Sequence, residues 1–158
     1  MDFKEIYEQF APQVFRVCMG YANDRELARD LTQETFIGVW RGLPDFRHES
    51  RLSTWIFRIA TNTCLRALEK SRRLVSTELP SELSIPDEDS DDKKLAYLYQ
   101  CIAELEESDR IIISLDLEGV QQAEIAAIVG ISHSNVRTKI HRIKGKLTIK
   151  FKRHGQFE

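Results

Sequence analysis

A stretch near the C-terminal end of the chain, residues 121–150, constrains the fold more than any other. Apolar residues at helical spacing predict one helix over 121–129 and a second from about His133. Gly130-Ile131-Ser132 breaks the periodicity between them, and glycine supplies the backbone freedom that a tight turn needs. The second helix has a basic face opposite an apolar stripe of Val136, Ile140, Ile143 and Leu147. This division favours a DNA-binding helix-turn-helix, and the plainer alternative is a helical hairpin with a solvated basic face.

The basic character of this segment is hidden in the charge of the whole chain. The 158 residues carry 23 Lys+Arg and 25 Asp+Glu, a formal charge of −2. Residues 74–110 contain 3 Lys+Arg against 11 Asp+Glu, whereas residues 111–158 contain 8 against 4. Nucleic-acid binding depends on such local patches rather than on net charge. We expect the acidic middle segment to keep the free chain from binding DNA alone.

Helical periodicity also covers the N-terminal half. The expected helices run over 3–21, over 24–43 and from Leu52 or Ser53 to about Arg73. Pro12 suggests a kink or a break in the first helix. Asn23 followed by Glu26 predicts a capping box at the start of the second. That second helix is expected to bury Leu27, Ala28, Leu31, Phe36, Val39 and Trp40.

Residues 74–92 differ in composition from both flanks. They contain two prolines, four serines and a block of acids, and such a composition cannot bury enough apolar surface to become ordered. The helical pattern returns at about Lys93. We therefore expect an all-α protein, with two small helical domains over 1–73 and 93–158. A flexible acidic linker joins them, and the second contains the helix-turn-helix.

Several classes of protein are not expected. The N-terminus has acidic residues and no uninterrupted apolar run, so it does not indicate a signal peptide, and nothing approaches the roughly 18 apolar residues of a membrane span. Cys18, Cys64 and Cys101 lie in helical apolar patterns and are expected to be reduced core residues. The residues show neither metal-ligand spacing nor a catalytic triad, a paired-carboxylate motif or a phosphate-binding glycine loop. We expect a cytoplasmic protein with no catalytic residue, metal or cofactor.

Three patterns resemble bacterial sigma factors. Residues 30–40 read D-x-x-Q-E-x-F-x-x-x-W, and residues 46–62 read F-R-x-x-S-x-x-x-T-W-[apolar]-x-R-I-A-x-N, similar to the promoter-melting segment of that family. Glu118-Gly119, Glu124-Ile125-Ala126 and residues 130–142 are similar to its second DNA-binding domain. The chain thus resembles the sigma-70 family, of the extracytoplasmic-function type with two domains only.

The resemblance implies a role for each half. The family's matching helix docks on the largest subunit of core RNA polymerase, which implies polymerase contacts from Asp30, Gln33, Glu34 and Arg41. The promoter-melting segment implies contacts with the minus-10 element from Phe46, Arg47, Ser50, Arg51, Arg58, Asn62 and Arg66. These residue types suit an unstacked single strand, which needs cations for its phosphates and aromatic or apolar surfaces for its bases. The recognition helix implies contacts with the minus-35 element from His133, Ser134, Arg137, Thr138, Lys139, His141 and Arg142.

The expected function is therefore a sigma factor that binds core RNA polymerase and promoter DNA and is controlled by an anti-sigma factor. The chain departs from the family where Glu106 follows Leu105, since many members have proline there, and at Ile143, where a small alanine is common. These departures leave the promoter sequence open. The alternative is a free-standing helix-turn-helix regulator that binds duplex operator DNA without polymerase. A weaker third possibility is a helical enzyme with an appended DNA-binding module.

Overall fold

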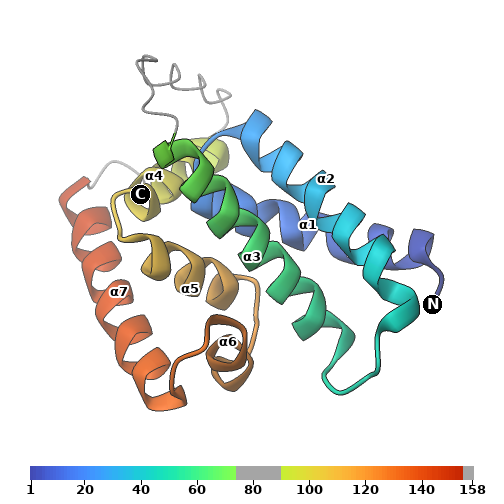
Figure 1. Ribbon diagram of the computed structural model, residues 1–158. Coiled ribbons are helices and arrows are strands. Elements are labelled where there is room, and N and C mark those ends of the chain that lie inside the picture. Colours follow the sequence, from blue (N-terminus) through green and yellow to red (C-terminus); the bar gives the residue numbers. More distant parts are fainter. Residues whose placement is uncertain (74–89, 155–158) are drawn as a thin grey trace.

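The computed structural model describes residues 1–73 and 90–154, and its regular elements in these ranges are all helical. The helices in Figure 1 are α1 Phe3–Ala22, α2 Arg25–Gly42, α3 Leu52–Arg73, α4 Ser90–Ala103, α5 Glu107–Leu117, α6 Gln122–Val129 and α7 His133–His154, with a short 3-10 helix η1 Leu43–Asp45. The predicted all-α class is confirmed. Residues 74–89 of the predicted linker lie outside the described residues, and its last three, 90–92, already belong to α4.

Two adjacent residues shape the corner between α1 and α2. Asn23 adopts a left-handed conformation with φ 49°, and its N–H donates to the carbonyl of Met19 at 2.8 Å. The Asp24 carboxylate accepts a hydrogen bond from the N–H of Leu27 at 3.1 Å and caps the start of α2. The predicted N-cap, Asn23, is therefore wrong by one residue. Asparagine tolerates the left-handed conformation that ends a helix, so Asn23 closes α1 and leaves the next residue to begin α2.

Pro12 does not break α1, which is continuous from Phe3 to Ala22. A proline inside a helix removes the hydrogen bond to the carbonyl four residues earlier. Pro12 and Glu8 are both exposed, so water can reach the carbonyl that loses its donor.

The packing of α2 corrects a second expectation. Its buried side chains are Ala28, Leu31, Thr32, Thr35, Phe36 and Val39, and they face α1 and α3. Leu27 and Trp40, which were predicted to be buried, are 41% and 62% exposed. The buried positions recur every three or four residues along one side of the helix, and neither Leu27 nor Trp40 lies on that side. The indole of Trp55 on α3 occupies the space beside Gly42 at the end of α2, where an added Cβ would lie 3.0 Å from the ring.

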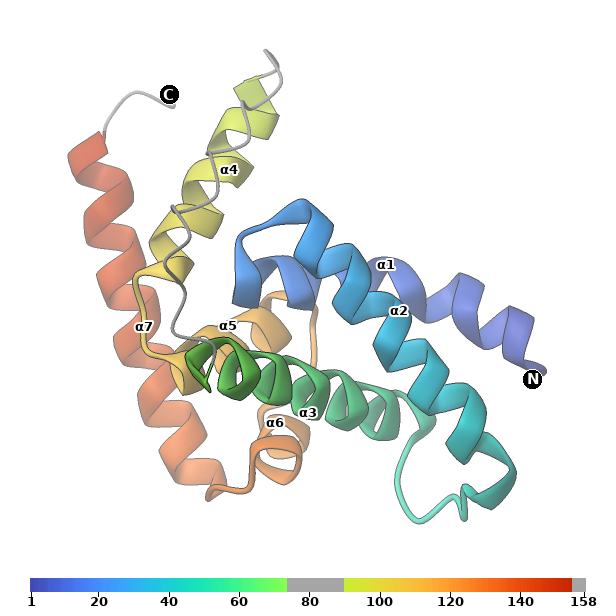
Figure 2. The same cartoon turned by 45° about the horizontal axis from the view of Figure 1, so that its top comes forward.

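The two halves of the chain pack against each other in one molecule. Helix α5 packs against α1, and α6 packs against α3, as Figures 1 and 2 show. One hydrophobic cluster contains Val17 and Ile56 from the first half together with Ile112 and Ile125 from the second. Gly20 of α1 lies so close to α5 that an added Cβ would sit 2.0 Å from the Ser114 hydroxyl oxygen. A glycine inside a helix is unfavourable, and here it allows the two helices to approach.

The helix-turn-helix is formed as predicted. Gly130 has a φ of 79° and ends α6, and the Ser132 hydroxyl accepts a hydrogen bond from the N–H of Asn135 at 3.1 Å near the start of α7. The predicted apolar stripe of α7 is buried. Two of its residues, Ile143 and Leu147, form a second cluster with Cys101, Ile102 and Ile113 of α4 and α5. The three cysteines are buried and form no disulfide, as expected.

Candidate functional site

One face of α2 combines exposed polar and apolar side chains. All four predicted polymerase contacts, Asp30, Gln33, Glu34 and Arg41, are exposed. Ile37 and Trp40 recur on the same face at helical spacing and are 50% and 62% exposed. We call these six residues the α2 stripe. Large exposed apolar side chains within a polar face are typical of a protein-docking surface.

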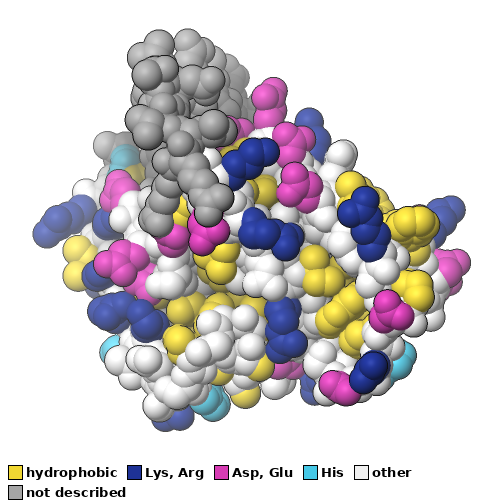
Figure 3. Space-filling view, viewed as in Figure 1, with side chains coloured by type: hydrophobic (Ala, Val, Ile, Leu, Met, Phe, Trp, Pro, Cys, Tyr) yellow, Lys and Arg dark blue, Asp and Glu magenta, His cyan; other side chains and the backbone are white. Residues whose placement is uncertain are grey.

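A surface cavity lies beside the C-terminal end of the α2 stripe. It has a volume of about 550 Å³ and is lined by Phe3, Trp40, Arg41, Leu43 and Pro44. In Figure 3, hydrophobic side chains reach the surface on the right, where the end of α2 meets the start of α1. The stripe therefore continues into an apolar hollow that a partner's side chain could fill.

The loop before α3 holds an aromatic stack. The ring of Phe46 stacks on Trp55 with centroids 4.7 Å apart, and the centroid of the His48 ring lies 4.5 Å from that of Phe46. Arg47 is exposed, and the Ser50 hydroxyl donates to the carbonyl of Arg51 at 3.3 Å. A half-buried aromatic ring beside an exposed arginine can both stack on a base and neutralise a phosphate.

The predicted DNA-facing side of α3 is partly covered by α6. The Glu124 carboxylate lies 3.1 Å from the guanidinium of Arg51 and accepts a hydrogen bond from the Thr54 hydroxyl at 3.2 Å. One turn further along α3, Arg58 donates to the carbonyl of Ala127 at 3.4 Å. Asn62 and Arg66, nearer the end of α3, remain exposed. Of the seven predicted minus-10 residues, Arg47, Asn62 and Arg66 are thus exposed and unengaged by the second half, Phe46 and Ser50 are half-buried, and Arg51 and Arg58 contact the second half of the chain.

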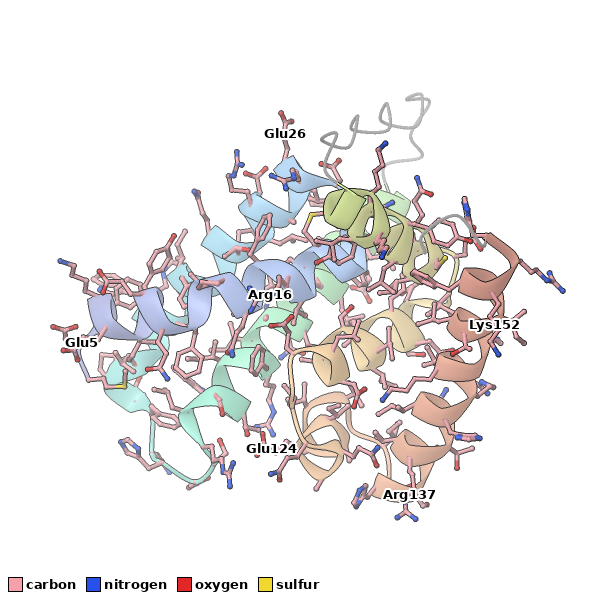
Figure 4. All side chains as sticks on the ribbon, turned by 180° about the vertical axis from the view of Figure 1, so that it is seen from behind. Glu5, Arg16, Glu26, Glu124, Arg137 and Lys152 are labelled. Atoms are coloured by element: carbon pink, nitrogen blue, oxygen red, sulfur yellow. The ribbon has the colours of Figure 1, made fainter. Side chains whose placement is uncertain are left out.

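A second ion pair, between Arg16 and Glu118, also joins the halves. The Nε of Arg16 donates to both carboxylate oxygens of Glu118 at 2.9 Å, and its Nη2 lies 2.8 Å from Oε1. The hydrogen bond to Glu118 raises the pKa of Arg16 above its ordinary value, so the guanidinium stays charged. Figure 4 labels Arg16 and Glu124 at the two contacts between the halves.

The predicted minus-35 residues all belong to α7 but differ in their surroundings. His133, Ser134, Arg137, Thr138 and His141 are exposed. Lys139 and Arg142 instead face α5, where the carboxylate of Asp109 lies 3.4 Å from the Lys139 ammonium and 3.2 Å from the Arg142 guanidinium. Asp109 itself is 3% exposed. Figure 4 shows Arg137 pointing away from the rest of the protein at the start of α7.

Sequence reasoning missed three residues that shape these surfaces. No role was predicted for Ile37, because it lies among polar residues. Its position three residues after Glu34 places it on the same helix face. Glu124 and Asp109 form ion pairs with residues that are distant in the sequence, and no local sequence pattern identifies such partners.

Two negative observations apply to the described part of the chain. None of its helices is both long and apolar enough to cross a bilayer. Nor do its histidine, cysteine, aspartate and glutamate side chains form a group of three that could hold a metal ion.

Both halves match known sequence families. Residues 6–74 match the family described as Sigma-70 region 2, and residues 95–147 match the one described as Sigma-70, region 4. Among similar proteins, the ECF RNA polymerase sigma factor SigE of Mycolicibacterium smegmatis is 28% identical over 98% of this chain and 63% of its own length. The RNA polymerase sigma factor SigZ of Bacillus subtilis is 26% identical over 93% of this chain and 85% of its own. The chain thus spans less than two thirds of one of these relatives.

Two solved structures share the fold. The sigma factor RpoE of Bartonella quintana, in complex with the anti-sigma factor NepR, has a TM-score of 0.74 at 22% identity and is matched over 96% of this chain and 97% of its own. CnrH, in complex with the cytosolic domain of CnrY, has a TM-score of 0.73 at 22% identity, covering 95% of this chain and 87% of that one.

Proposed function

Because the chain belongs to the sigma-70 family of RNA polymerase sigma factors, of the extracytoplasmic-function type, we propose that it joins core RNA polymerase and directs it to a limited set of promoters. The observation that carries this proposal is the presence of the exposed α2 stripe and an exposed recognition helix in one chain. A regulator that only binds a duplex operator has no need of the first surface. We assign polymerase binding and minus-10 melting to residues 1–73 and minus-35 recognition to residues 93–158. Such a factor acts in the cytoplasm, where polymerase and promoters lie.

The α2 stripe is the proposed polymerase-binding surface. Aromatic side chains dominate the energetics of protein interfaces, and Trp40 is available for contact next to the charged Arg41, with Asp30 nearly three turns away on the same stripe. Charged residues around such an anchor set orientation and suppress wrong partners. Asp30→Ala is therefore expected to weaken assembly with core polymerase and to leave the DNA preference unchanged. Unaltered assembly and transcription would refute this assignment of the helix face.

The loop before α3 and the face of α3 are the proposed minus-10 reader. Melting requires contacts that offset the few kcal/mol of unstacking each base. Phe46 and Arg47 can offer these contacts in the present arrangement, whereas Arg51 and Arg58 are engaged by α6. Binding of the minus-10 strand by Arg51 and Arg58 thus competes with their contacts to α6 and favours separation of the two halves.

The first turns of α7 are the proposed minus-35 reader. Arg137 is the best placed for guanine, and a bidentate contact of this kind discriminates by about 1–3 kcal/mol. Ser134 and Thr138 lie on either side of it along the exposed face and suit phosphate contacts that set register.

We further propose regulation by an anti-sigma factor. Two proteins that share this fold were solved with CnrY and NepR, and NepR is named as an anti-sigma factor. A partner that holds the halves together would keep α6 on α3 and block the minus-10 face.

Run-off transcription tests the proposal. Purified core polymerase is assayed with and without the chain on a pool of genomic promoters from its host. New start sites that depend on the chain are expected, and they would define both promoter elements. If no start site appears while the chain alone shifts duplex DNA, the chain acts as a free-standing regulator.

A further inference from the structure

A buried carboxylate beneath the recognition helix is unused by the proposed function. Asp109 lies in the first turn of α5 and is 3% exposed. Its Oδ1 accepts a hydrogen bond from the Lys139 ammonium at 3.4 Å, and its Oδ2 accepts one from the Arg142 guanidinium at 3.2 Å. Removing a carboxylate from water is costly unless it is paired, and these two bases provide the pairing. The amide groups at the start of a helix also favour a negative charge there.

Together with the buried apolar stripe of α7, the two pairs set the rotation of this helix about its own axis. Lys139 and Arg142 are separated by about one turn, so both point to the side of the helix that faces α5. With 3.6 residues per turn, Arg137 lies roughly 200° from Lys139 and roughly 140° from Arg142 around that axis. Fastening these two bases to Asp109 therefore turns Arg137 toward solvent, as Figure 4 shows.

Other acids of the second half continue this pairing along α7. Asp116, seven residues after Asp109 on α5, lies 3.1 Å from the Lys144 ammonium. Lys150 pairs with Glu104. Within the described ranges, the bases of α7 that form no ion pair are Arg137, Lys146, Lys152 and Arg153. The basic side chains of α7 therefore form two groups, those that pair with an acid of the second half and those that form no ion pair within the described ranges.

We propose that Asp109 is a positioning residue for DNA recognition, which aims Arg137 and withdraws Lys139 and Arg142 from the DNA backbone. The inference rests on the proposed binding of α7 to the minus-35 element. The side chains of Lys139 and Arg142 are 25% and 50% exposed, so each can reach a phosphate once it is released. Withholding two cations lowers the sequence-independent part of the affinity and leaves a larger share to base contacts.

The test compares the full-length chain with its Asp109→Asn variant on a duplex of about 30 base pairs of random sequence. Each neutralised phosphate adds about 0.9 to the slope of log affinity against log salt, so two released cations steepen it by up to about 1.8. The variant then loses up to about twelvefold more affinity than the parent chain between 50 and 200 mM salt. Asp109→Glu is expected to keep the parent slope. The double variant Asp109→Asn with Arg142→Gln is expected to show about half of the increase in slope that Asp109→Asn shows alone.

Two results would overturn the inference. A merely structural role for Asp109 would lower the melting temperature and the affinity while the slope stayed the same. If Arg142 already contacts a phosphate, Arg142→Gln alone would flatten the parent slope. Because the acidic middle segment is expected to mask the free chain, a parent chain that shows no duplex binding is compared with its variants after assembly with core polymerase, where the same two results decide. If that assembly also shows no salt-dependent duplex binding, the proposed minus-35 function is refuted instead.

Discussion

The two helices assigned to DNA, α3 and α7, differ in what covers them. The outward side of α7 is open, and Arg137 on it has no ion pair among the described residues. At α3, by contrast, Arg51 just before the helix pairs with Glu124, and Arg58 within it donates to the carbonyl of Ala127. The helix proposed to read duplex DNA is therefore open in the closed molecule, whereas the helix proposed to read melted DNA is partly occupied by α6.

The difference suggests an order of events on the promoter. The two surfaces proposed for polymerase and for the minus-35 duplex, the α2 stripe and the outward side of α7, are both exposed while the halves remain packed. Arg51 and Arg58 are released from α6 when the shared core between α1, α3, α5 and α6 is opened. Opening exposes apolar surface, so contacts with polymerase and DNA must offset its free-energy cost.

The largest expected effect is on binding to core polymerase. The α2 stripe proposed for it is exposed in the closed molecule, as is the outward side of α7. Trp40→Ala removes a 62% exposed aromatic side chain from the stripe. If Trp40 anchors the interface, its truncation costs about 2 kcal/mol or more and weakens binding to core polymerase about 30-fold. Titration of a fluorescently labelled chain with core polymerase measures this loss, and duplex binding by the free chain is the control. Equal polymerase affinity would place the docking surface elsewhere.

Gly20→Ala tests the packing that covers α3. The added Cβ would lie 2.0 Å from the Ser114 hydroxyl oxygen and 3.0 Å from its Cβ, so α1 and α5 must shift apart. Overpacking of this kind costs about 1–3 kcal/mol in the free energy of unfolding. Urea unfolding measures the cost, and small-angle scattering measures the expected increase in radius of gyration.

The matched control for this change is Gly145→Ala on α7. An added Cβ there meets nothing within 4 Å. Alanine at an open helical position should stabilise the protein by roughly 0.5–1 kcal/mol. Two alanine variants with the same effect on stability would show that the closed contact at Gly20 is absent in solution.

Arg137→Ala tests whether the outward side of α7 is open in the closed molecule. Loss of a bidentate guanine contact reduces discrimination at one base pair by about 1–3 kcal/mol. Because α7 is already open, the loss should be the same in the parent chain and in the Gly20→Ala background. Competition binding with single base-pair variants of the identified minus-35 element measures it. A loss that appears only after opening would mean that α7 is also masked.

The smallest expected effect comes from Glu124→Gln, which removes the charge that pairs with Arg51. Partly exposed pairs contribute roughly 0.2–1 kcal/mol, which corresponds to at most about fivefold tighter binding of the free chain to a single-stranded minus-10 oligonucleotide. Glu26→Gln on the exposed side of α2 changes the net charge equally and serves as the control. If both variants gained the same affinity for the oligonucleotide, the gain would come from long-range electrostatics and not from release of Arg51.

Local patterns in the sequence were sufficient for most of the helices. The predicted start of α3 at Leu52 and of α7 at His133 agree with the structure, because apolar periodicity and turn residues act within one or two turns of the chain. The corner at Asn23 and Asp24 was misplaced by one residue, since both side chains can cap a helix and the backbone conformation decides between them.

The sequence alone determined an all-α chain, a helix-turn-helix with a buried stripe on α7 and the family resemblance that assigned roles to its residues. Only the tertiary structure decided that Trp40 is exposed, that Glu124 engages Arg51 and that Asp109 holds Lys139 and Arg142. These contacts join residues 30 to 73 positions apart, or depend on which side of α2 meets its neighbours. Periodicity identifies the apolar side of a helix, but the packing of several helices determines which charged groups meet and which remain free to bind a partner.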